Sequence, residues 1–229
     1  MKDFFGHKKK DPLSEALSQP EFDIIETLLW ENGSFFLLES HINRLEKSAK
    51  HFSFQRDINE VRDFLDYTVS SFEKGHEYRV RLSLKKNGKL QLSSLPLDMP
   101  GKLPVKIALS DHRTDKSDEF LYHKTTFRKL YDHELTKYRT HGYFDVIFRN
   151  KNNEITEGTI SNIMIRTGEI YLTPPVSCGI LAGTYRDYLL KKDDFPLKEG
   201  ILHQKDLESA DEIFVINSVR KMIPAVFSK

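Results

Sequence analysis

The apolar positions of residues 22–96 predict two strands, two helices and two further strands. Apolar runs at 22–30 and 34–38 flank Glu31-Asn32-Gly33, a typical hairpin turn. The strictly alternating "YRVRLSL", followed by the Asn-Gly pair of "KKNGKLQLSS", predicts a second hairpin. Between the hairpins, apolar residues recur every three or four positions, which is the helical period, over "ESHINRLEKSAKHF" and over 57–73.

The C-terminal half predicts a longer mixture of strands and helices. Helices are expected over 126–140 and from "GTYRDYLLKK". In "ITEGTISN", Glu157 is expected in a glycine-containing turn between two strands. The apolar runs that predict strands are "VKIALS", "YFDVIFRN", "NIMIRT", "EIYLTP" and "DEIFVINS".

A proline-rich segment separates these two halves. "SSLPLDMPGKLP" contains three prolines and one glycine, as linkers often do. We therefore predict an α+β protein with an N-terminal lobe at 1–97, a linker at 98–104 and a C-terminal lobe at 105–229. The polar residues 1–20 are expected to be weakly ordered.

Composition narrows the class of protein. The 229 residues include 35 basic and 34 acidic side chains, a net charge of +1, which gives no electrostatic case for binding nucleic acid. No apolar run reaches membrane-spanning length, and the N-terminus lacks the apolar core of a signal peptide, so a cytoplasmic location without membrane contact is expected. The single cysteine, Cys178, excludes an intrachain disulfide. The scattered histidines show no metal-ligand spacing, so no metal site is expected.

Several side chains could carry chemistry, although each is ordinary alone. Lys124 in "HKTT" could be a surface charge, and Glu157 a solvated carboxylate. Arg44 could lie on the exposed face of its helix. The glycine and threonine of "LAGTYRDYLL" precede a helix, where free N–H groups favour an anion, but Thr184 could equally be a plain cap. Asn217 and Ser218 end a strand, where turn chemistry explains them as well.

The order of these segments is more specific than any one of them. "LLESHINRL", "HKTT", "ITEGTISNI", "TPPVSCGILAGTYR" and "FVINSVRKMIPA" together resemble the class IV family of pyridoxal-phosphate enzymes, from about Phe22 to Pro224. That family includes branched-chain and D-amino-acid aminotransferases and aminodeoxychorismate lyase. The resemblance implies the two-lobed class IV fold, pyridoxal 5'-phosphate between the lobes and a homodimer.

The resemblance also implies roles for individual residues. Lys124 corresponds to the lysine that forms a Schiff base with the cofactor, and Glu157 to the carboxylate that meets its ring nitrogen. A buried lysine amine loses its proton more readily, which imine formation requires. The cofactor phosphate is expected to contact the remaining residues of the set, which are Arg44, the backbone at Thr184 and Tyr185, and Asn217 with Ser218.

Within the family, the lyase branch is preferred. Thr27 of "FDIIET" falls where aminodeoxychorismate lyase has a threonine near the cofactor, and "HKTT" and "NSVR" point the same way. The chain departs from the family pattern in two places: "SQPEF" replaces the usual Gly-Asp-Gly, and "KKNGKL" is shorter than the arginine-bearing loop that helps relatives bind the substrate carboxylate. Arg79 and Arg81, on one strand face, are candidates to bind substrate carboxylates instead, and a solvent-facing pair fits the sequence equally well.

The predicted reaction converts 4-amino-4-deoxychorismate into 4-aminobenzoate and pyruvate, in folate biosynthesis. A functional link to aminodeoxychorismate synthase would follow from that reaction. Two alternatives remain open. One is an amino-acid aminotransferase with the same Lys124, Arg44 and Glu157. The other is a non-catalytic binding protein on the same fold.

Overall fold

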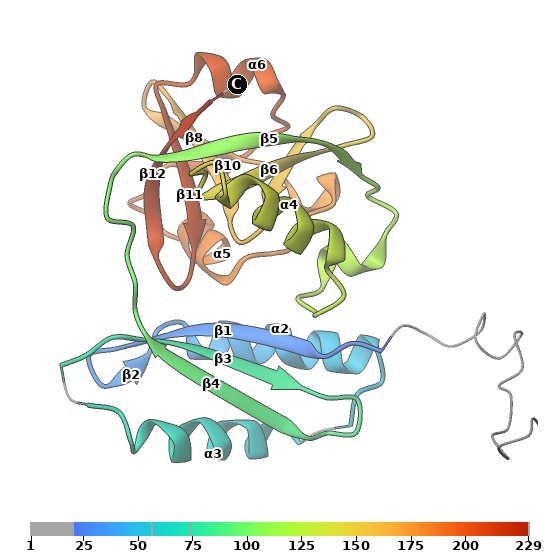
Figure 1. Cartoon of the computed structure of the whole chain (residues 1–229), viewed down its shortest axis with the longest axis vertical. Helices are drawn as coiled ribbons and strands as arrows, with labels where there is room; N and C mark the ends of the chain where they lie inside the picture. Colours follow the sequence, from blue (N-terminus) through green and yellow to red (C-terminus); the bar gives the residue numbers. More distant parts are fainter. Residues whose placement is uncertain (1–20, 56, 74, 229) are drawn as a thin grey trace, which may run out of the picture.

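The structure is a computed structural model that describes residues 21–55, 57–73 and 75–228. The chain forms two α+β bodies stacked on each other (Figure 1). The N-terminal lobe is built on a four-stranded sheet and the C-terminal lobe on an eight-stranded sheet. Residues 97–104 join them. The domain limits 1–97 and 105–229 stay a proposal, and the expected weak order of residues 1–20 concerns residues outside the described part.

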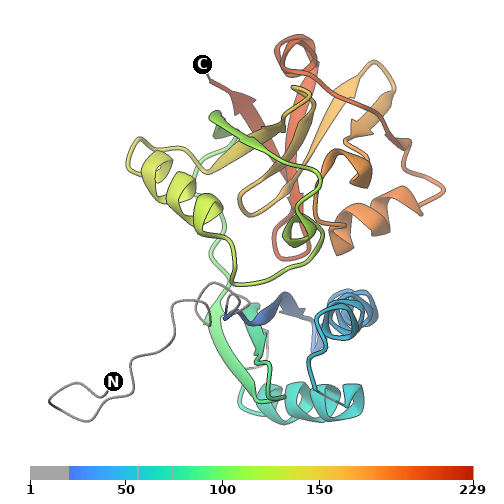
Figure 2. The same cartoon turned by 90° about the vertical axis from the view of Figure 1, so that its right-hand side faces the viewer.

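The N-terminal lobe has the predicted order of two strands, two helices and two strands. Its sheet order is β2-β1-β3-β4, with antiparallel pairing throughout. The two helices lie on the same face of this sheet (Figure 2). The elements are β1 (Ile24–Glu31), β2 (Ser34–Phe35), α2 (Leu38–His51), α3 (Ile58–Val69), β3 (Tyr78–Leu84) and β4 (Leu90–Pro96).

Alternation along β1 decides which side chains enter the N-terminal core. Ile24 and Leu28 point toward the helices and pack in one apolar cluster with Leu45 of α2. Glu26 lies between them in this series and is only 2% exposed. Thr27 has the opposite orientation, because successive side chains of a strand point to opposite faces. One face of the sheet therefore forms the core, and the other is available to the C-terminal lobe.

The C-terminal lobe is a partly closed barrel. The sheet order is β10-β9-β8-β11-β12-β5-β6-β7, and β7 also pairs with β8, which closes part of the sheet on itself. Its elements are β5 (Val105–Thr114), the short 3-10 helix η1 (Glu119–Tyr122), α4 (Lys129–Arg139), β6 (Asp145–Asn150), β7 (Ile155–Gly158), β8 (Asn162–Thr167), β9 (Ile170–Thr173), η2 (Val176–Cys178), α5 (Thr184–Leu190), β10 (Leu197–Glu199), α6 (Gln204–Ser209), β11 (Glu212–Asn217) and β12 (Lys221–Phe227).

Two local predictions in this lobe were wrong. Glu157 lies inside the strand β7, not in a turn, because residues 155–158 pair with β6 and Glu157 pairs with Asn162 of β8. The helix expected from residue 126 begins at Lys129. The preceding backbone is already engaged, since Thr125 forms a β-bridge with Ile24. The strands β10 and β12 and the helix α6 were not predicted as elements.

Candidate active site

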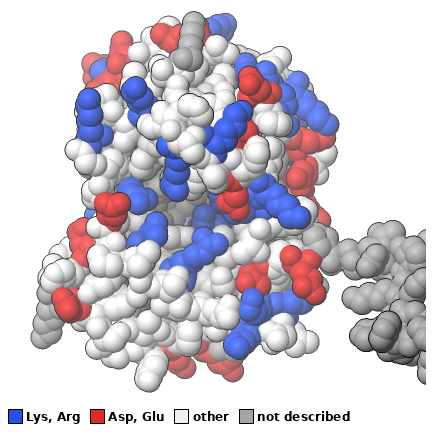
Figure 3. All heavy atoms as spheres, viewed as in Figure 1, with Lys and Arg blue, Asp and Glu red and all other residues white. Residues whose placement is uncertain are grey.

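A cavity of about 870 Å³ lies where the two lobes meet. A space of this size accommodates a small molecule or cofactor. Figure 3 shows Lys and Arg side chains on both sides of the groove between the lobes. The cavity lining includes nine of the residues predicted from the sequence, namely Thr27, Arg44, Arg79, Arg81, Lys124, Glu157, Thr184, Asn217 and Ser218. Tyr185 does not line it; this side chain packs in an apolar cluster with Met164 and Leu189.

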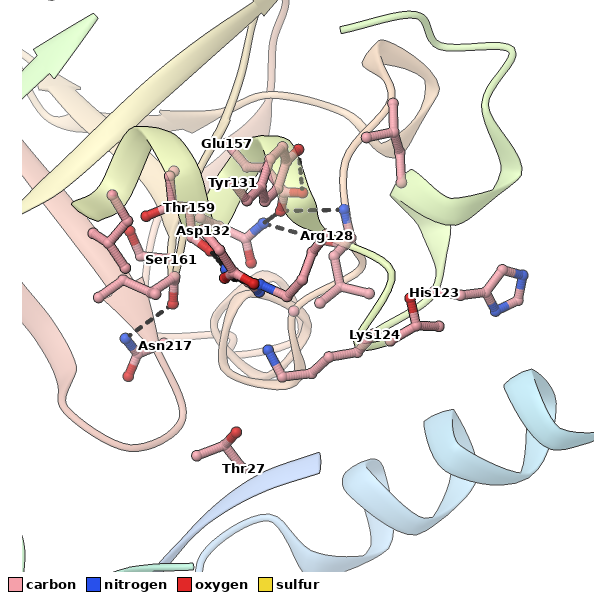
Figure 4. A pocket seen from close by; sticks show the side chains of 18 of the residues that line it. Thr27, His123, Lys124, Arg128, Tyr131, Asp132, Glu157, Thr159, Ser161 and Asn217 are labelled. Atoms are coloured by element: carbon pink, nitrogen blue, oxygen red, sulfur yellow. Dashed lines mark hydrogen bonds and ion pairs between the residues drawn. The ribbon is translucent and has the colours of Figure 1, made fainter. Parts of the chain in front are cut away.

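Backbone pairing with β1 positions Lys124. The Ile25 N–H donates to the Lys124 carbonyl at 2.9 Å, and the Thr126 N–H donates to the Asp23 carbonyl at 2.9 Å. β2 covers only the far end of β1, so this edge of β1 is free to accept the segment. The pairing holds Lys124 against the strand that carries Thr27. In Figure 4 the Lys124 amine points into the cavity, and the Thr27 side chain projects into the cavity from β1, on the side of the N-terminal lobe.

The Lys124 amine has an unusual protonation equilibrium. Burial, reinforced by the positive charges of Arg44 and Arg128, lowers its pKa from 10.5 to about 7. A substantial fraction of the amine is then uncharged at neutral pH. An uncharged amine is the form that attacks a carbonyl or accepts a proton. Lys124 can therefore serve as a nucleophile or a base.

Glu157 is a buried carboxyl group that forms no ion pair with any residue the structure describes. It accepts hydrogen bonds from the Leu181 N–H, from Asn162 Nδ2 and from the Tyr131 hydroxyl, each at 3.2 Å (Figure 4 shows Tyr131 beside it). Burial nevertheless raises its pKa from 4.5 to about 8. A cationic ring nitrogen placed against Glu157 would favour the ionised carboxylate. Sequence reasoning missed Asn162 and Tyr131, whose roles depend on the fold.

Arg44 is held by two neighbouring groups. Its Nε and Nη2 donate to the two carboxylate oxygens of Glu26, at 2.8 and 2.6 Å. Its Nη1 donates to the Ala182 carbonyl at 3.1 Å. The guanidinium group has further N–H groups beyond these three, and Arg44 borders the cavity. Glu26 and its second partner, His41, were not predicted. A charged residue within the apolar run "FDIIETLLW" was the available signal.

The loop after β7 and the turn after β11 form another wall of the cavity. Asp145 is fully buried and accepts hydrogen bonds from the backbone and hydroxyl groups of Thr159 and from Ser161 Oγ. Asn217 organises the turn, because its Oδ1 accepts from two following backbone N–H groups and its Nδ2 donates to the Ile160 carbonyl. Ser218 Oγ donates to the Thr27 carbonyl at 3.4 Å. The wall is thus preformed and reaches the N-terminal lobe.

Arginine side chains of β3 line the part of the cavity that the N-terminal lobe forms. Thr27 on β1 pairs with Arg81 on β3, and Leu29 pairs with Arg79, so both arginines lie on the sheet face that Thr27 occupies. Burial and the charges of Arg128 and Arg79 lower the pKa of Arg81. Within the described residues, neither Arg79 nor Arg81 has an ion-pair partner. This region is therefore suited to bind an anion.

The donor set fits pyridoxal 5'-phosphate. The cofactor needs an amine for its aldehyde, a carboxylate for its ring nitrogen, and donors for its phosphate. Lys124, Glu157 and Arg44 provide these three chemical types around one cavity. Close packing also shapes the site, since a Cβ added at Gly183 would lie 1.9 Å from Asn162 Oδ1. The described residues contain no group of three potential metal ligands, and no helix there is long and apolar enough to cross a membrane.

Comparisons with known proteins agree with this chemistry. The model of the family "Amino-transferase class IV" matches residues 23–226. The chain is 28% identical to a "Putative aminodeoxychorismate lyase" of Schizosaccharomyces pombe, covering 90% of each chain. It is also 28% identical to an "Aminodeoxychorismate lyase" of Bacillus subtilis, covering 88% of this chain and 75% of that one.

A solved structure extends the likeness to three dimensions. A "Putative amino-acid aminotransferase" from Mesorhizobium loti superimposes with a TM-score of 0.83 at 33% identity, covering 91% of this chain and all of that one. The family match spans most of the chain and includes every residue of the predicted site. The chain therefore belongs to the class IV aminotransferase family, and it is an enzyme of that family with the two-lobed α+β fold and pyridoxal 5'-phosphate as its cofactor.

Proposed function

We propose that this enzyme is a lyase that converts 4-amino-4-deoxychorismate into 4-aminobenzoate and pyruvate. The observation that carries the proposal is the position of Thr27, which lines the same cavity as Lys124 and pairs directly with Arg81 in the sheet. A hydroxyl group and a cation therefore border the same cavity as the reactive amine. The relatives named aminodeoxychorismate lyase support the same assignment.

Lys124 and Glu157 are proposed to serve the bond-breaking step. The bound cofactor withdraws electrons from the amine-bearing carbon of the substrate. With a pKa near 7, Lys124 exists partly as a free amine and removes the proton from that carbon. Glu157 stabilises positive charge at the ring nitrogen, and Arg44 binds the phosphate. Cleavage of the adjacent carbon–oxygen bond then releases pyruvate and leaves an aromatic ring.

Thr27 is proposed to move a proton to the departing pyruvate. Its side chain faces the cavity, and its backbone carbonyl accepts a hydrogen bond from Ser218 of the other lobe. The strand and this contact restrict where the hydroxyl can lie. A valine has nearly the same shape but cannot donate or accept a proton. The hydroxyl itself is therefore the feature to test.

Arg79 and Arg81 are proposed to bind the substrate carboxylates, of which 4-amino-4-deoxychorismate has two. A guanidinium group binds a carboxylate through two parallel hydrogen bonds. Arg220 also lines the cavity and extends this positive region. Burial is the main cause that lowers the pKa of Arg220, and the nearby charge of Arg79 lowers it further. A dianionic substrate would relieve the repulsion among these arginines.

Product analysis of three proteins tests the lyase proposal. The wild-type enzyme should release 4-aminobenzoate and pyruvate in equal amounts from 4-amino-4-deoxychorismate. Thr27→Val should lower kcat by about 10²-fold or more, as expected when a proton-transfer group is lost, with little change in cofactor affinity. Thr68→Val is the matched control, because the Thr68 hydroxyl donates to the Phe64 carbonyl of the same helix, α3, at 2.8 Å and Thr68 does not line the cavity. A wild-type enzyme that forms no 4-aminobenzoate would contradict the proposal.

An amino-acid aminotransferase is the second candidate. The structural relative from Mesorhizobium loti carries that description, and Lys124, Arg44 and Glu157 would serve both reactions. Incubation with an L- or D-amino acid and a 2-oxo acid separates the two candidates, because only an aminotransferase exchanges the amino group rapidly. A non-catalytic protein would remain inactive in both assays and would show no absorbance in the pyridoxal band.

The cellular location, the oligomeric state and the source of the substrate are also proposals. We expect a cytoplasmic homodimer that receives its small-molecule substrate from a reaction of the aminodeoxychorismate synthase type. Sedimentation equilibrium should give twice the mass of one chain, and a single-chain mass would reject the dimer.

A further inference from the structure

Glu26 is a carboxylate buried in an apolar layer, and the proposed reaction does not use it. It lies on the face of β1 that packs against α2, between the core residues Ile24 and Leu28. Its exposed fraction is 2%. It does not line the cavity, whereas the next residue, Thr27, does. Burying a charge is costly unless it is paired, so its partners indicate its role.

Glu26 has two partners on α2, the guanidinium group of Arg44 and the imidazole ring of His41. Arg44 donates to both carboxylate oxygens, at 2.8 and 2.6 Å, and His41 Nδ1 lies 2.7 Å from Oε2. Residues three positions apart on a helix share a face, which places His41 and Arg44 together. The two-point contact fixes the plane of the Arg44 guanidinium group.

The protonation states of Glu26 and His41 decide which group donates and which accepts each hydrogen bond of the network. Burial would raise the pKa of Glu26, but Arg44 and His41 outweigh it and lower that pKa to about 2, so Glu26 is an ionised acceptor. Burial lowers the pKa of His41, which is therefore neutral at pH 7 and donates from Nδ1. Its Nε2 is then an acceptor for the Thr184 hydroxyl at 3.2 Å. The network contacts Thr184 through its hydroxyl group and not through its backbone N–H.

The network crosses from one lobe to the other. Glu26, His41 and Arg44 belong to the N-terminal lobe, and Thr184 belongs to the C-terminal lobe. Arg44 Nη1 also donates to the Ala182 carbonyl at 3.1 Å. The segment 181–184 thus receives two contacts from this network, and its Leu181 N–H bonds to Glu157.

We propose that Glu26 is a positioning residue for the cofactor phosphate, which orients the Arg44 guanidinium group directly and the Thr184 segment through His41. Glu26 does not touch the cofactor and acts only through these two residues. The inference rests on Arg44 as the phosphate-binding residue of the proposed function, and it applies equally to a lyase and to an aminotransferase.

The test compares the binding of two ligands that differ by the phosphate group. Apo-protein of wild type, Glu26→Gln and Arg44→Lys is titrated with pyridoxal 5'-phosphate and with pyridoxal. Glu26→Gln should weaken pyridoxal 5'-phosphate about tenfold or more, the size expected for loss of a hydrogen bond to a charged group, and weaken pyridoxal by less than about threefold. Arg44→Lys should show the same selectivity.

A matched control separates positioning from the general loss of a buried charge. Glu134 is a fully buried carboxylate on α4 that bonds to Ser110 and does not line the cavity. Glu134→Gln should leave the ratio of the two dissociation constants unchanged. If Glu26→Gln gives an unchanged ratio, whether both ligands weaken equally or neither weakens, the proposal is overturned.

If Arg44→Lys keeps the wild-type ratio, Arg44 does not recognise the phosphate, and the role of Glu26 falls with it. If Glu26→Gln does not fold, His41→Phe replaces it, because His41 does not line the cavity and links Glu26 to the Thr184 hydroxyl. A phosphate-selective loss in His41→Phe supports the proposal, and an unchanged ratio overturns it. Lack of lyase activity would reject the proposed reaction without altering these ratios.

Discussion

At the scale of single residues, the protonation of Lys124 is the main consequence of the fold. A lysine on the surface is almost entirely protonated at neutral pH and is a poor nucleophile. Here the amine borders a cavity that also contains Arg44 and Arg128, and both the burial and these charges disfavour its ammonium form. The residue type was evident from "HKTT", but its reactivity comes from its surroundings.

The capture of the cofactor by apo-protein should therefore depend on pH in a characteristic way. The free amine reacts, so the rate of the absorbance change on adding pyridoxal 5'-phosphate should increase as pH rises through about 7, the pKa of Lys124, and level off above it. Lys124→Ala should show no such change at any pH. A rate that continues to rise toward pH 10 would mean that Lys124 has the pKa of an ordinary lysine.

At the scale of elements, the strands determine which neighbouring residues share a task. Glu26 and Thr27 are adjacent in sequence, yet Glu26 enters the α2 layer and Thr27 faces the cavity. The short connection before α5 has a similar effect, because the backbone at Gly183 lies against the side chain of Asn162, which bonds to Glu157. Small changes in these elements should therefore alter the site.

Gly183→Ala should damage the site through Asn162. The backbone of Gly183 has φ −68° and ψ 132°, which alanine adopts easily, so the effect is steric. The new Cβ would lie 1.9 Å from Asn162 Oδ1 and would displace the group that supports Glu157. We expect a loss of about 1–3 kcal/mol in the free energy of unfolding, together with weaker cofactor binding.

Thermal unfolding and cofactor titration check this prediction. Gly101→Ala is the control, since a Cβ at Gly101 would meet no atom within 4 Å. Equal effects of the two substitutions would show that the contact between Gly183 and Asn162 has no special importance.

At the scale of the whole molecule, charge is nearly balanced in number but not in space. The chain has a net charge of only +1. Its arginines nevertheless gather around the interlobe cavity, where Arg79, Arg81, Arg128 and Arg220 all contribute to the lining. A narrow cavity bordered by protein concentrates such a field. The overall composition does not reveal this local excess of positive charge, because a count of residues does not say where they lie in the fold.

The KM for an anionic substrate should therefore depend on salt. Raising the ionic strength from about 0.05 M to about 0.5 M shortens the screening length severalfold, so the KM for 4-amino-4-deoxychorismate should increase while kcat changes little. The double variant Arg79→Gln/Arg81→Gln should have a high KM at low salt and a weaker salt dependence. A salt response identical to that of wild type would exclude these arginines from substrate binding.

The sequence by itself determined the local elements and the chemical inventory of this protein. Periodicity predicted the N-terminal lobe, because strands and helices there follow the alternation of apolar and polar residues. The ordered motifs around Lys124, Glu157 and Arg44 indicated the family, which the comparisons confirmed. Glu157 was nevertheless placed in a turn, because its strand β7 is defined by pairing with β6 and β8 rather than by its own pattern.

Only the tertiary structure decided how those residues work together. The link from Glu26 through His41 to Thr184 joins residues separated by up to 158 positions (184 − 26), and no local pattern encodes such a contact. The lowered pKa of Lys124 likewise depends on burial and on charges brought close by the packing of two lobes. Local sequence sets residue type and backbone preference, whereas distance, desolvation and shared partners arise only when the chain folds.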